Sequence, residues 1–212
     1  MNPKKTKPHA SFHSEAERRK WQNPEAILVG IGLRRGLTFI DIGCGDGFFA
    51  LPASKIVGKE GKVYCLDIDD EAIDRLKETA VNESLDNVYA KIGAAEETII
   101  CQECADIIFF GIVLHDFTDP GKVLSNASRM LKPTGRLIDL DWKKASMELG
   151  PPLQTRFSEQ TATSLIETAG FKIETVKEAG PYHYLILAKP QSSGKHAGTT
   201  IETPRFGPRR CP

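Results

Sequence analysis

Between residues 37 and 140, short apolar runs alternate with amphipathic segments, a pattern that predicts a helix after each strand. The predicted strands are 37–42, 62–67, 87–92, 104–110 and 134–140, and the predicted helices are 46–57, 69–83 and 119–131. The run ADIIFFGIVL (105–114) is apolar at almost every position, as expected of a strand buried on both faces. The alternation predicts an α/β fold: a doubly wound, mostly parallel sheet with helices on both faces.

The C-terminal part of the pattern departs from this alternation. A helix is predicted at 158–169, with Ser158 as its N-cap, and two strands follow, FKIETVKEAG and YHYLILAKP. Only Gly180 and Pro181 separate these strands, so we expect them to pair antiparallel.

Composition divides the chain into a domain and two tails. Residues 1–13 are basic and are expected to be a disordered lead-in, and 191–212 are rich in Gly, Pro, Ser and Thr and are expected to be a disordered tail. Residues 14–190 are predicted to form a single domain, with N-terminal helices in 14–35. Residues 141–157 follow the fifth strand and are either a lid or a solvated loop.

Charge and cysteine content narrow the class of protein. The chain has 212 residues, and its 28 Lys and Arg balance its 28 Asp and Glu. A nucleic-acid partner is therefore disfavoured, although a local basic patch would escape this count. No apolar run reaches the roughly 18 residues of a membrane span, and the N-terminus lacks the apolar core of a signal peptide. Five cysteines, an odd number, fit a reducing cytoplasm better than a disulfide framework, so a cytoplasmic location is predicted.

The stretch FIDIGCGDGFFALPA (39–53) places three glycines between the first strand and the first helix. Gly43, Gly45 and Gly47 allow positive φ and let a ligand approach the backbone closely. Ligands of doubly wound sheets bind at the carboxyl ends of the strands, where this turn is expected. A tight turn without a ligand is the alternative, but three glycines at this place favour a binding site.

Charge and spacing around the turn distinguish two ligands. The spacing G-x-G-x-G puts Phe48 where the dinucleotide motif G-x-G-x-x-G has its third glycine, and Asp46 would repel a pyrophosphate at the helix start. S-adenosylmethionine (SAM) instead carries an ammonium and a sulfonium, which Asp41 and Asp46 would attract. The sequence therefore favours SAM.

The end of the second strand supports a nucleoside ligand. Asp67 lies 20 residues after Gly47, where an acidic side chain can accept both ribose hydroxyls. A surface or N-cap role is the alternative for Asp67, although Asp69 or Asp70 suits the cap better. Ile68 is expected to pack on the adenine.

Five segments carry a family resemblance: FIDIGCGDGFFALPA, GKVYCLDID, KIGAAEE, ADIIFFGIVLHDF and MLKPTGRLIDLDW. In this order, from about Trp21 to Lys189, the chain resembles the class I SAM-dependent methyltransferases, with a UbiE-like core of the small-molecule type. The resemblance covers about four fifths of the chain. It implies a seven-stranded, Rossmann-like sheet whose last strand is antiparallel.

The resemblance also implies a set of cofactor contacts. The methionine end of SAM would lie against Asp41, Gly43, Cys44, Gly45 and Gly111, with Asp41 reaching the amino group through water. The chain departs from the family at Ala94, where many relatives have an Asp that binds the adenine amino group. Adenine recognition would then depend on the backbone near Ala94 and Ala95, on Glu96, or on apolar packing.

His115 and Asp116 follow the fourth strand and are the candidate catalytic residues. At that end of the strand His115 could take a proton from the methyl acceptor. The alternative is an imidazole in the pocket wall, with Asp116 or Asp119 capping the next helix. Many methyl transfers need no base, because SAM is already activated and positioning supplies much of the catalysis.

Other candidates are weaker. Cys101 and Cys104 form a single C-x-x-C, which is half a zinc site at most, so two ordinary half-buried cysteines and no metal site are predicted. Trp142, Lys143 and Arg156 are candidate substrate contacts, with a solvated loop as the alternative.

Missing motifs narrow the acceptor. After the fourth strand there is no N/D-P-P-Y, typical of methyltransferases that act on adenine or glutamine, and no Pro-Cys nucleophile for pyrimidine methylation. The favoured function is methyl transfer from SAM to an unidentified small molecule by SN2 displacement. A SAM-binding regulatory or scaffold module, and an RNA or protein methyltransferase with basic ends as tethers, remain alternatives.

Overall fold

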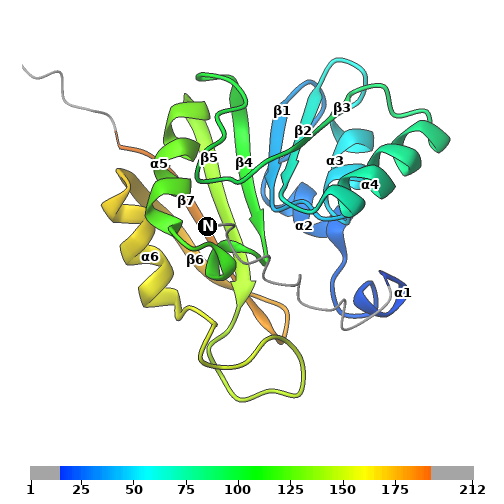
Figure 1. Cartoon of the computed structure of the whole chain (residues 1–212). Coiled ribbons are helices and arrows are strands. Elements are labelled where there is room, and N and C mark those ends of the chain that lie inside the picture. The colour runs from blue at the N-terminus through cyan, green and yellow to red at the C-terminus, as the bar shows by residue number, and fades with distance from the viewer. Residues whose placement is uncertain (1–14, 192–212) are drawn as a thin grey trace, which may run out of the picture.

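A seven-stranded sheet forms the centre of the molecule, in the order β3-β2-β1-β4-β5-β7-β6 (Figure 1). This computed structural model describes residues 15–191, so the predicted lead-in and nearly all of the predicted tail lie outside the described residues. The strands are β1 (Thr38–Ile42), β2 (Lys62–Asp67), β3 (Val88–Ile92), β4 (Ala105–Gly111), β5 (Leu131–Trp142), β6 (Phe171–Ala179) and β7 (His183–Pro190). Strands β1 to β5 pair parallel, whereas β7 is antiparallel to both β5 and β6. The predicted doubly wound sheet and its antiparallel last strand are confirmed.

Helices cover both faces of the sheet. They are α1 (Glu15–Arg18), α2 (Pro24–Gly30), α3 (Ala50–Val57), α4 (Asp70–Asn82), α5 (Pro120–Met130), α6 (Glu159–Thr168) and the 3-10 helix η1 (Leu114–Asp116). Side chains of α2, α3 and α4 belong to the core on one face, and those of η1, α5 and α6 to the core on the other (Figure 1). Among the described residues, no helix is both long and apolar enough to cross a bilayer.

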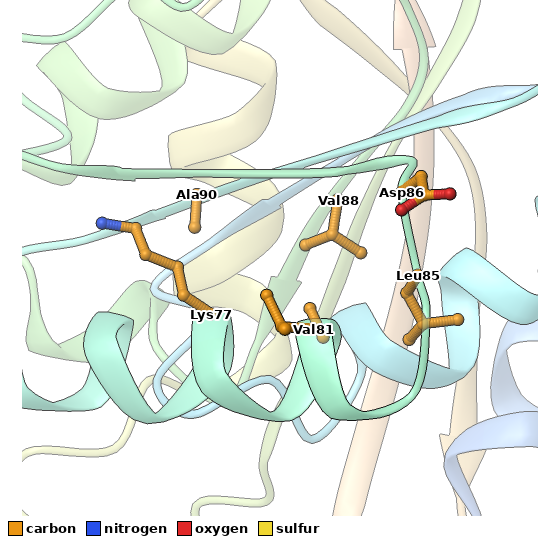
Figure 2. Close-up of a pocket in the computed structure, with 7 residues that line it drawn as sticks. Lys77, Val81, Leu85, Asp86, Val88 and Ala90 are labelled. Atoms are coloured by element: carbon orange, nitrogen blue, oxygen red, sulfur yellow. The ribbon is translucent and has the colours of Figure 1, made fainter.

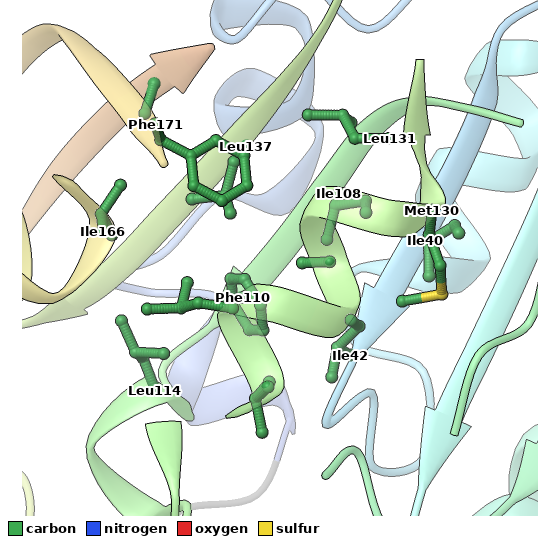
Figure 3. Close-up of a cluster of buried hydrophobic side chains, with 14 of the residues drawn as sticks. Ile40, Ile42, Ile108, Phe110, Leu114, Met130, Leu131, Leu137, Ile166 and Phe171 are labelled. Carbon is green, nitrogen blue, oxygen red and sulfur yellow. The ribbon is translucent and has the colours of Figure 1, made fainter. Parts of the chain in front are cut away.

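Alternation along the central strands fills both cores. Ile40 and Ile108 point into the core under α5 and α6, which Figure 3 shows, whereas Phe39 and Phe109 point into the core under α2, α3 and α4. All four side chains are fully buried. Burial on both faces is the physical reason that these strands are apolar throughout.

Side-chain caps fix where four helices begin, and at the start of α2 Asn23 accepts the backbone N–H of Ala26. Asp69 accepts the backbone N–H of Ala72 at the start of α4, and Asp119 accepts that of Lys122 at the start of α5. Ser158 caps α6 as predicted. Each cap satisfies a backbone donor that has no partner within its helix.

Two predicted boundaries were wrong. The helix predicted at 46–57 begins only at Ala50, because residues 45–49 form turns around glycines with positive φ. The strand predicted at 134–140 runs from Leu131 to Trp142, since it pairs with β4 on one side and β7 on the other.

Cys101 and Cys104 are joined by a disulfide, so the prediction of two ordinary cysteines was wrong. A turn precedes β4, in which Glu103 takes a left-handed conformation with φ 46°. This turn brings the two Cα atoms to 6.0 Å, within the range that a disulfide spans. The disulfide lies before β4, at the edge of the sheet opposite the carboxyl ends of the parallel strands.

Candidate active site

The predicted site residues meet at the carboxyl edge of β1, β2 and β4. Gly43 directly follows β1, Asp67 ends β2 and Gly111 ends β4. The register pairs β1 with both other strands, so these ends are neighbours although 68 positions separate Gly43 from Gly111. The parallel topology therefore brings the predicted cofactor residues together.

Asp67 ties the glycine turn to the end of β2. One carboxylate oxygen accepts the N–H of Gly45 at 2.7 Å, and the other accepts the N–H of Asp69 at 2.9 Å. Asp67 is only half-buried. A carboxylate has about four lone-pair sites, so each oxygen keeps acceptor capacity for a ligand hydroxyl.

The glycines of the turn and the one that ends β4 differ in what a Cβ atom would contact at each position. Gly43 has φ 74°, and a Cβ there would lie 2.5 Å from a methyl carbon of Val113. A Cβ at Gly111 would lie 2.7 Å from the ring of Phe109. At Gly45, with φ 54°, a Cβ would meet no atom within 4 Å, counting the described residues. Gly43 and Gly111 are thus required by packing, whereas Gly45 leaves open space beside the backbone, as a ligand cradle needs.

Asp41 is a buried carboxyl with unused acceptor capacity. Its side chain is 1% exposed, and its Oδ2 atom has no hydrogen-bond partner within residues 15–191. Burial, together with the charge of Asp67, raises the pKa of Asp41 to about 7, although Arg18 acts in the opposite direction. A buried carboxylate without a partner is costly, and a ligand cation would remove that cost.

The side chain of Cys44 is buried in the core, and its thiol donates to the carbonyl oxygen of Gly45 at 3.5 Å. A hydrogen bond with Cys65 of β2, and burial, raise the pKa of the Cys44 thiol. This thiol is therefore neutral and inert, and only the backbone of Cys44 can contact a ligand.

The predicted adenine end is formed by Ile68 and the loop after β3. The side chain of Ile68 is 74% exposed next to Asp67, and Ala94 is half-buried. Asn126 of α5, a residue that sequence analysis missed, donates from Nδ2 to the carbonyl oxygens of Ala95 and Glu96, at 2.9 Å each. Nothing in the sequence links Asn126 to a loop some thirty residues earlier, because only the fold brings them together.

His115 of η1 makes a close pair with Asp141 of β5, which was also missed. Nδ1 of His115 lies 2.7 Å from one carboxylate oxygen of Asp141 and 2.9 Å from the other, and both side chains are buried. Nε2 of His115 lies 3.4 Å from the carboxylate of Asp116. Burial favours a lower pKa for His115, but the hydrogen bond and charge of Asp141 outweigh it and raise the pKa.

Arg156, a candidate substrate contact, organises the loop after β5. Its guanidinium donates to the carbonyl oxygens of Lys143, Ala145, Leu149 and Pro151, at 2.8 to 3.3 Å. The residue is 4% exposed. All four acceptors lie between residues 143 and 151. Arg156 therefore holds residues 143–156 in one conformation.

Aromatic rings join the N-terminal segment to the β7 end of the same edge. The ring centroid of Trp21 lies 5.4 Å from that of His183 in a stacked arrangement, and Trp142 lies 4.3 Å from His183. Burial lowers the pKa of His183 to about 3, so this imidazole is neutral at physiological pH. Trp142, a candidate substrate contact, is 8% exposed and belongs to this cluster.

A separate hollow lies between α4 and β3 (Figure 2). It measures about 220 Å³ and is lined by Lys77, Ala80, Val81, Leu85, Asp86, Val88 and Ala90. None of the predicted site residues at the carboxyl edge of β1, β2 and β4 lines this hollow, so the hollow is not part of the candidate active site.

Comparison with known proteins shows the family to which this domain belongs. Residues 33–180 match the family model described as a methyltransferase domain, which is more than half of the chain. The chain belongs to this methyltransferase family. The glycine turn and the end of β4 of this chain lie inside the matched region.

Individual methyltransferases are similar over most of this chain. The ubiquinone/menaquinone biosynthesis C-methyltransferase UbiE of Marinomonas sp. (strain MWYL1) is 30% identical over 73% of this chain, which spans 59% of that protein. The crystal structure of a SAM dependent methyltransferase from Aquifex aeolicus is 30% identical, with a TM-score of 0.77, over 83% of this chain and 98% of that one. An S-adenosylmethionine dependent methyltransferase from Mesorhizobium loti, 17% identical with a TM-score of 0.64, covers 77% of this chain and 95% of its own and shares the fold.

Proposed function

We propose that this protein binds SAM at the glycine turn and transfers its methyl group to a small-molecule acceptor. The observation that carries the proposal is the pair of carboxyl groups beside the open backbone of Gly45. Asp67 keeps free acceptor capacity at the end of β2, and the buried Asp41 has an oxygen without a partner among the described residues. A ligand with a ribose at one end and an ammonium at the other satisfies both groups.

Each end of SAM has residues suited to hold it. Asp67 would accept the ribose hydroxyls, and Asp41 would pair with the ammonium of the methionine end. The exposed side chain of Ile68 would pack on the adenine, beside the loop that Asn126 fixes. The backbone around Gly45 would contact the methionine moiety at close range.

The chain would act on the acceptor chiefly by positioning. When bound, SAM supplies an activated methyl group on a sulfonium. Residues 143–157, tied together by Arg156, would act as a lid that excludes water and orients the acceptor in line. His115 and Asp116, at the end of β4, would take up a proton from acceptors that lose one.

The relatives support a small-molecule acceptor without naming it. The Marinomonas relative is named for ubiquinone and menaquinone biosynthesis, but this chain spans only 59% of it. The acceptor and its attacking atom therefore require a screen. A cytoplasmic location stays a prediction from the sequence.

Calorimetric titration tests the cofactor part of the proposal. SAM and S-adenosylhomocysteine should bind the wild-type protein with micromolar affinity, and Asp67→Ala should lose that binding. The matched control is Asp74→Ala, because Asp74 is an exposed carboxylate on α4. Absence of binding by a folded wild type would refute the proposal, whereas binding would justify a screen of acceptors by methyl transfer.

A further inference from the structure

Asp141 is held in a fixed orientation beside His115. Its Oδ1 atom accepts the backbone N–H of Trp142 at 2.7 Å, and its side chain is 1% exposed. With that bond in place, both carboxylate oxygens still lie within 2.9 Å of Nδ1 of His115. The imidazole is thus held from one side by a buried acid on the next strand.

This contact determines where the imidazole carries its proton. An ionised carboxylate has only acceptors, so Nδ1 must be the donor. In the neutral imidazole the lone pair then lies on Nε2, which faces Asp116 at 3.4 Å.

Other charged groups around the pair are few among the described residues. Arg156 acts on His115 from the loop after β5, in the direction that lowers its pKa. Asp139 lies two residues before Asp141 on the same face of β5, and burial followed by the charge of Asp141 raises the pKa of Asp139. Tyr184 lies opposite Asp141 on β7. Among these groups, Asp141 is the acid whose carboxylate contacts Nδ1 of His115.

We propose that Asp141 is a positioning residue for methyl transfer: it fixes His115 with its proton on Nδ1, so that Nε2 receives the proton of the acceptor. This inference rests on the proposed function. The acceptor atom forms a bond to the methyl carbon while the carbon–sulfur bond breaks and its electron pair stays on sulfur. The acceptor proton moves to Nε2, and Asp141 and Asp116 flank the resulting imidazolium. That proton then leaves to solvent.

The tautomer of His115 tests this inference without any ligand. Nitrogen NMR of the SAM-free protein, with the signal assigned by His115→Asn, should show the proton on Nδ1 in the neutral form. Asp141→Asn should mix the tautomers and lower the pKa of His115, because burial and Arg156 would no longer be opposed by a charge at Nδ1. The matched control is Asp139→Asn, which replaces a neighbouring buried acid whose carboxyl oxygens have no hydrogen-bond partner among the described residues, and which should leave the His115 signal unchanged.

Kinetics give the second readout once an acceptor is found. Asp141→Asn should lower kcat by about 10-fold or more, with KM little changed, and move the acid limb of the pH profile to lower pH. Asp139→Asn should keep the wild-type profile. If Asp141→Asn does not fold, the tautomer of His115 in the wild-type protein still tests the inference. A neutral imidazole with its proton on Nε2 would overturn it. A wild type that binds no SAM would refute the proposed function instead, and leave the tautomer result standing.

Discussion

The carboxylate of Asp67 lies 2.7 Å from the backbone nitrogen of Gly45, across the gap between the end of β2 and the glycine turn. The turn is therefore held in its open shape by the same side chain that we assign to the ribose. Such pre-organisation reduces the entropy lost when a ligand binds. It also means that a change at this position acts on both the turn and the ligand.

Replacing Asp67 by Asn should weaken SAM binding through both the turn and the ligand contact. The amide oxygen can still accept one backbone N–H, but the amide nitrogen cannot accept the second, and the charge is lost. We expect SAM affinity to fall by about 10- to 100-fold, as for a lost charge-assisted hydrogen bond of roughly 1.5 to 3 kcal/mol. Calorimetry measures the affinity, and unchanged binding would contradict the ribose assignment.

Asp41 should make the fold less stable as pH rises. In the unfolded chain this carboxyl ionises near the ordinary aspartate pKa of 3.8, whereas in the folded protein burial and the charge of Asp67 raise the pKa to about 7. The folded state thus keeps a proton that the unfolded state loses, so stability falls from the ordinary carboxyl range up to about pH 7 and is level above it. The loss amounts to at most about 4 kcal/mol.

The variant Asp41→Asn should not show this loss. Relative to wild type, it should gain thermal stability at about pH 8 but not at about pH 3, where Asp41 is largely protonated in both the folded and the unfolded chain. The contribution of Asp139 is common to both proteins and cancels. Asp74→Asn, on the exposed side of α4, is the control, and a pH-independent difference for Asp41→Asn would show that Asp41 titrates normally.

The variant Gly43→Ala should destabilise the protein through the contact between the segments that follow the parallel strands β1 and β4. Alanine at φ 74° is strained, and its Cβ would lie 2.5 Å from a methyl carbon of Val113, so that side chain would have to shift. We expect a loss of about 2–3 kcal/mol in urea denaturation. Gly30→Ala is the control, because Gly30 ends α2 with no atom within 4 Å of a Cβ, and equal losses in the two variants would refute the steric argument.

Removing the guanidinium of Arg156 should loosen the loop after β5. In Arg156→Met four carbonyl bonds are lost while the apolar stem is largely kept. Amide hydrogen exchange in residues 143–156 should become markedly faster, with little change in β1 and β4. Arg75→Met, an exposed position on α4, should leave the exchange of this loop unchanged, and an equal effect in both variants would contradict the assigned role.

Local chemistry made the residues at the carboxyl ends of β1, β2 and β4 predictable from sequence. The glycine turn, Asp67 and the end of β4 each sit at a fixed place relative to a strand, and parallel topology brings strand ends to one edge. The start of α3 at Ala50 was missed because the apolar pattern of this helix begins earlier than the helix itself. Three glycines with positive φ precede Ala50 and delay the helix. The Cys101–Cys104 disulfide was missed because the number of cysteines says nothing about the turn that joins two of them.

The sequence by itself determined the fold class, the order of the elements and the residues at the carboxyl ends of β1, β2 and β4. These depend on hydrophobic period, turn chemistry and local spacing, which the chain carries residue by residue. Only the tertiary structure decided that Asp141 holds His115, that Asn126 fixes the loop at Ala95, and that Arg156 faces carbonyl oxygens. The contact of Asp141 with His115 and that of Asn126 with Ala95 join residues 26 and 31 positions apart. Both contacts depend on the strand order and on which side of the sheet each helix packs.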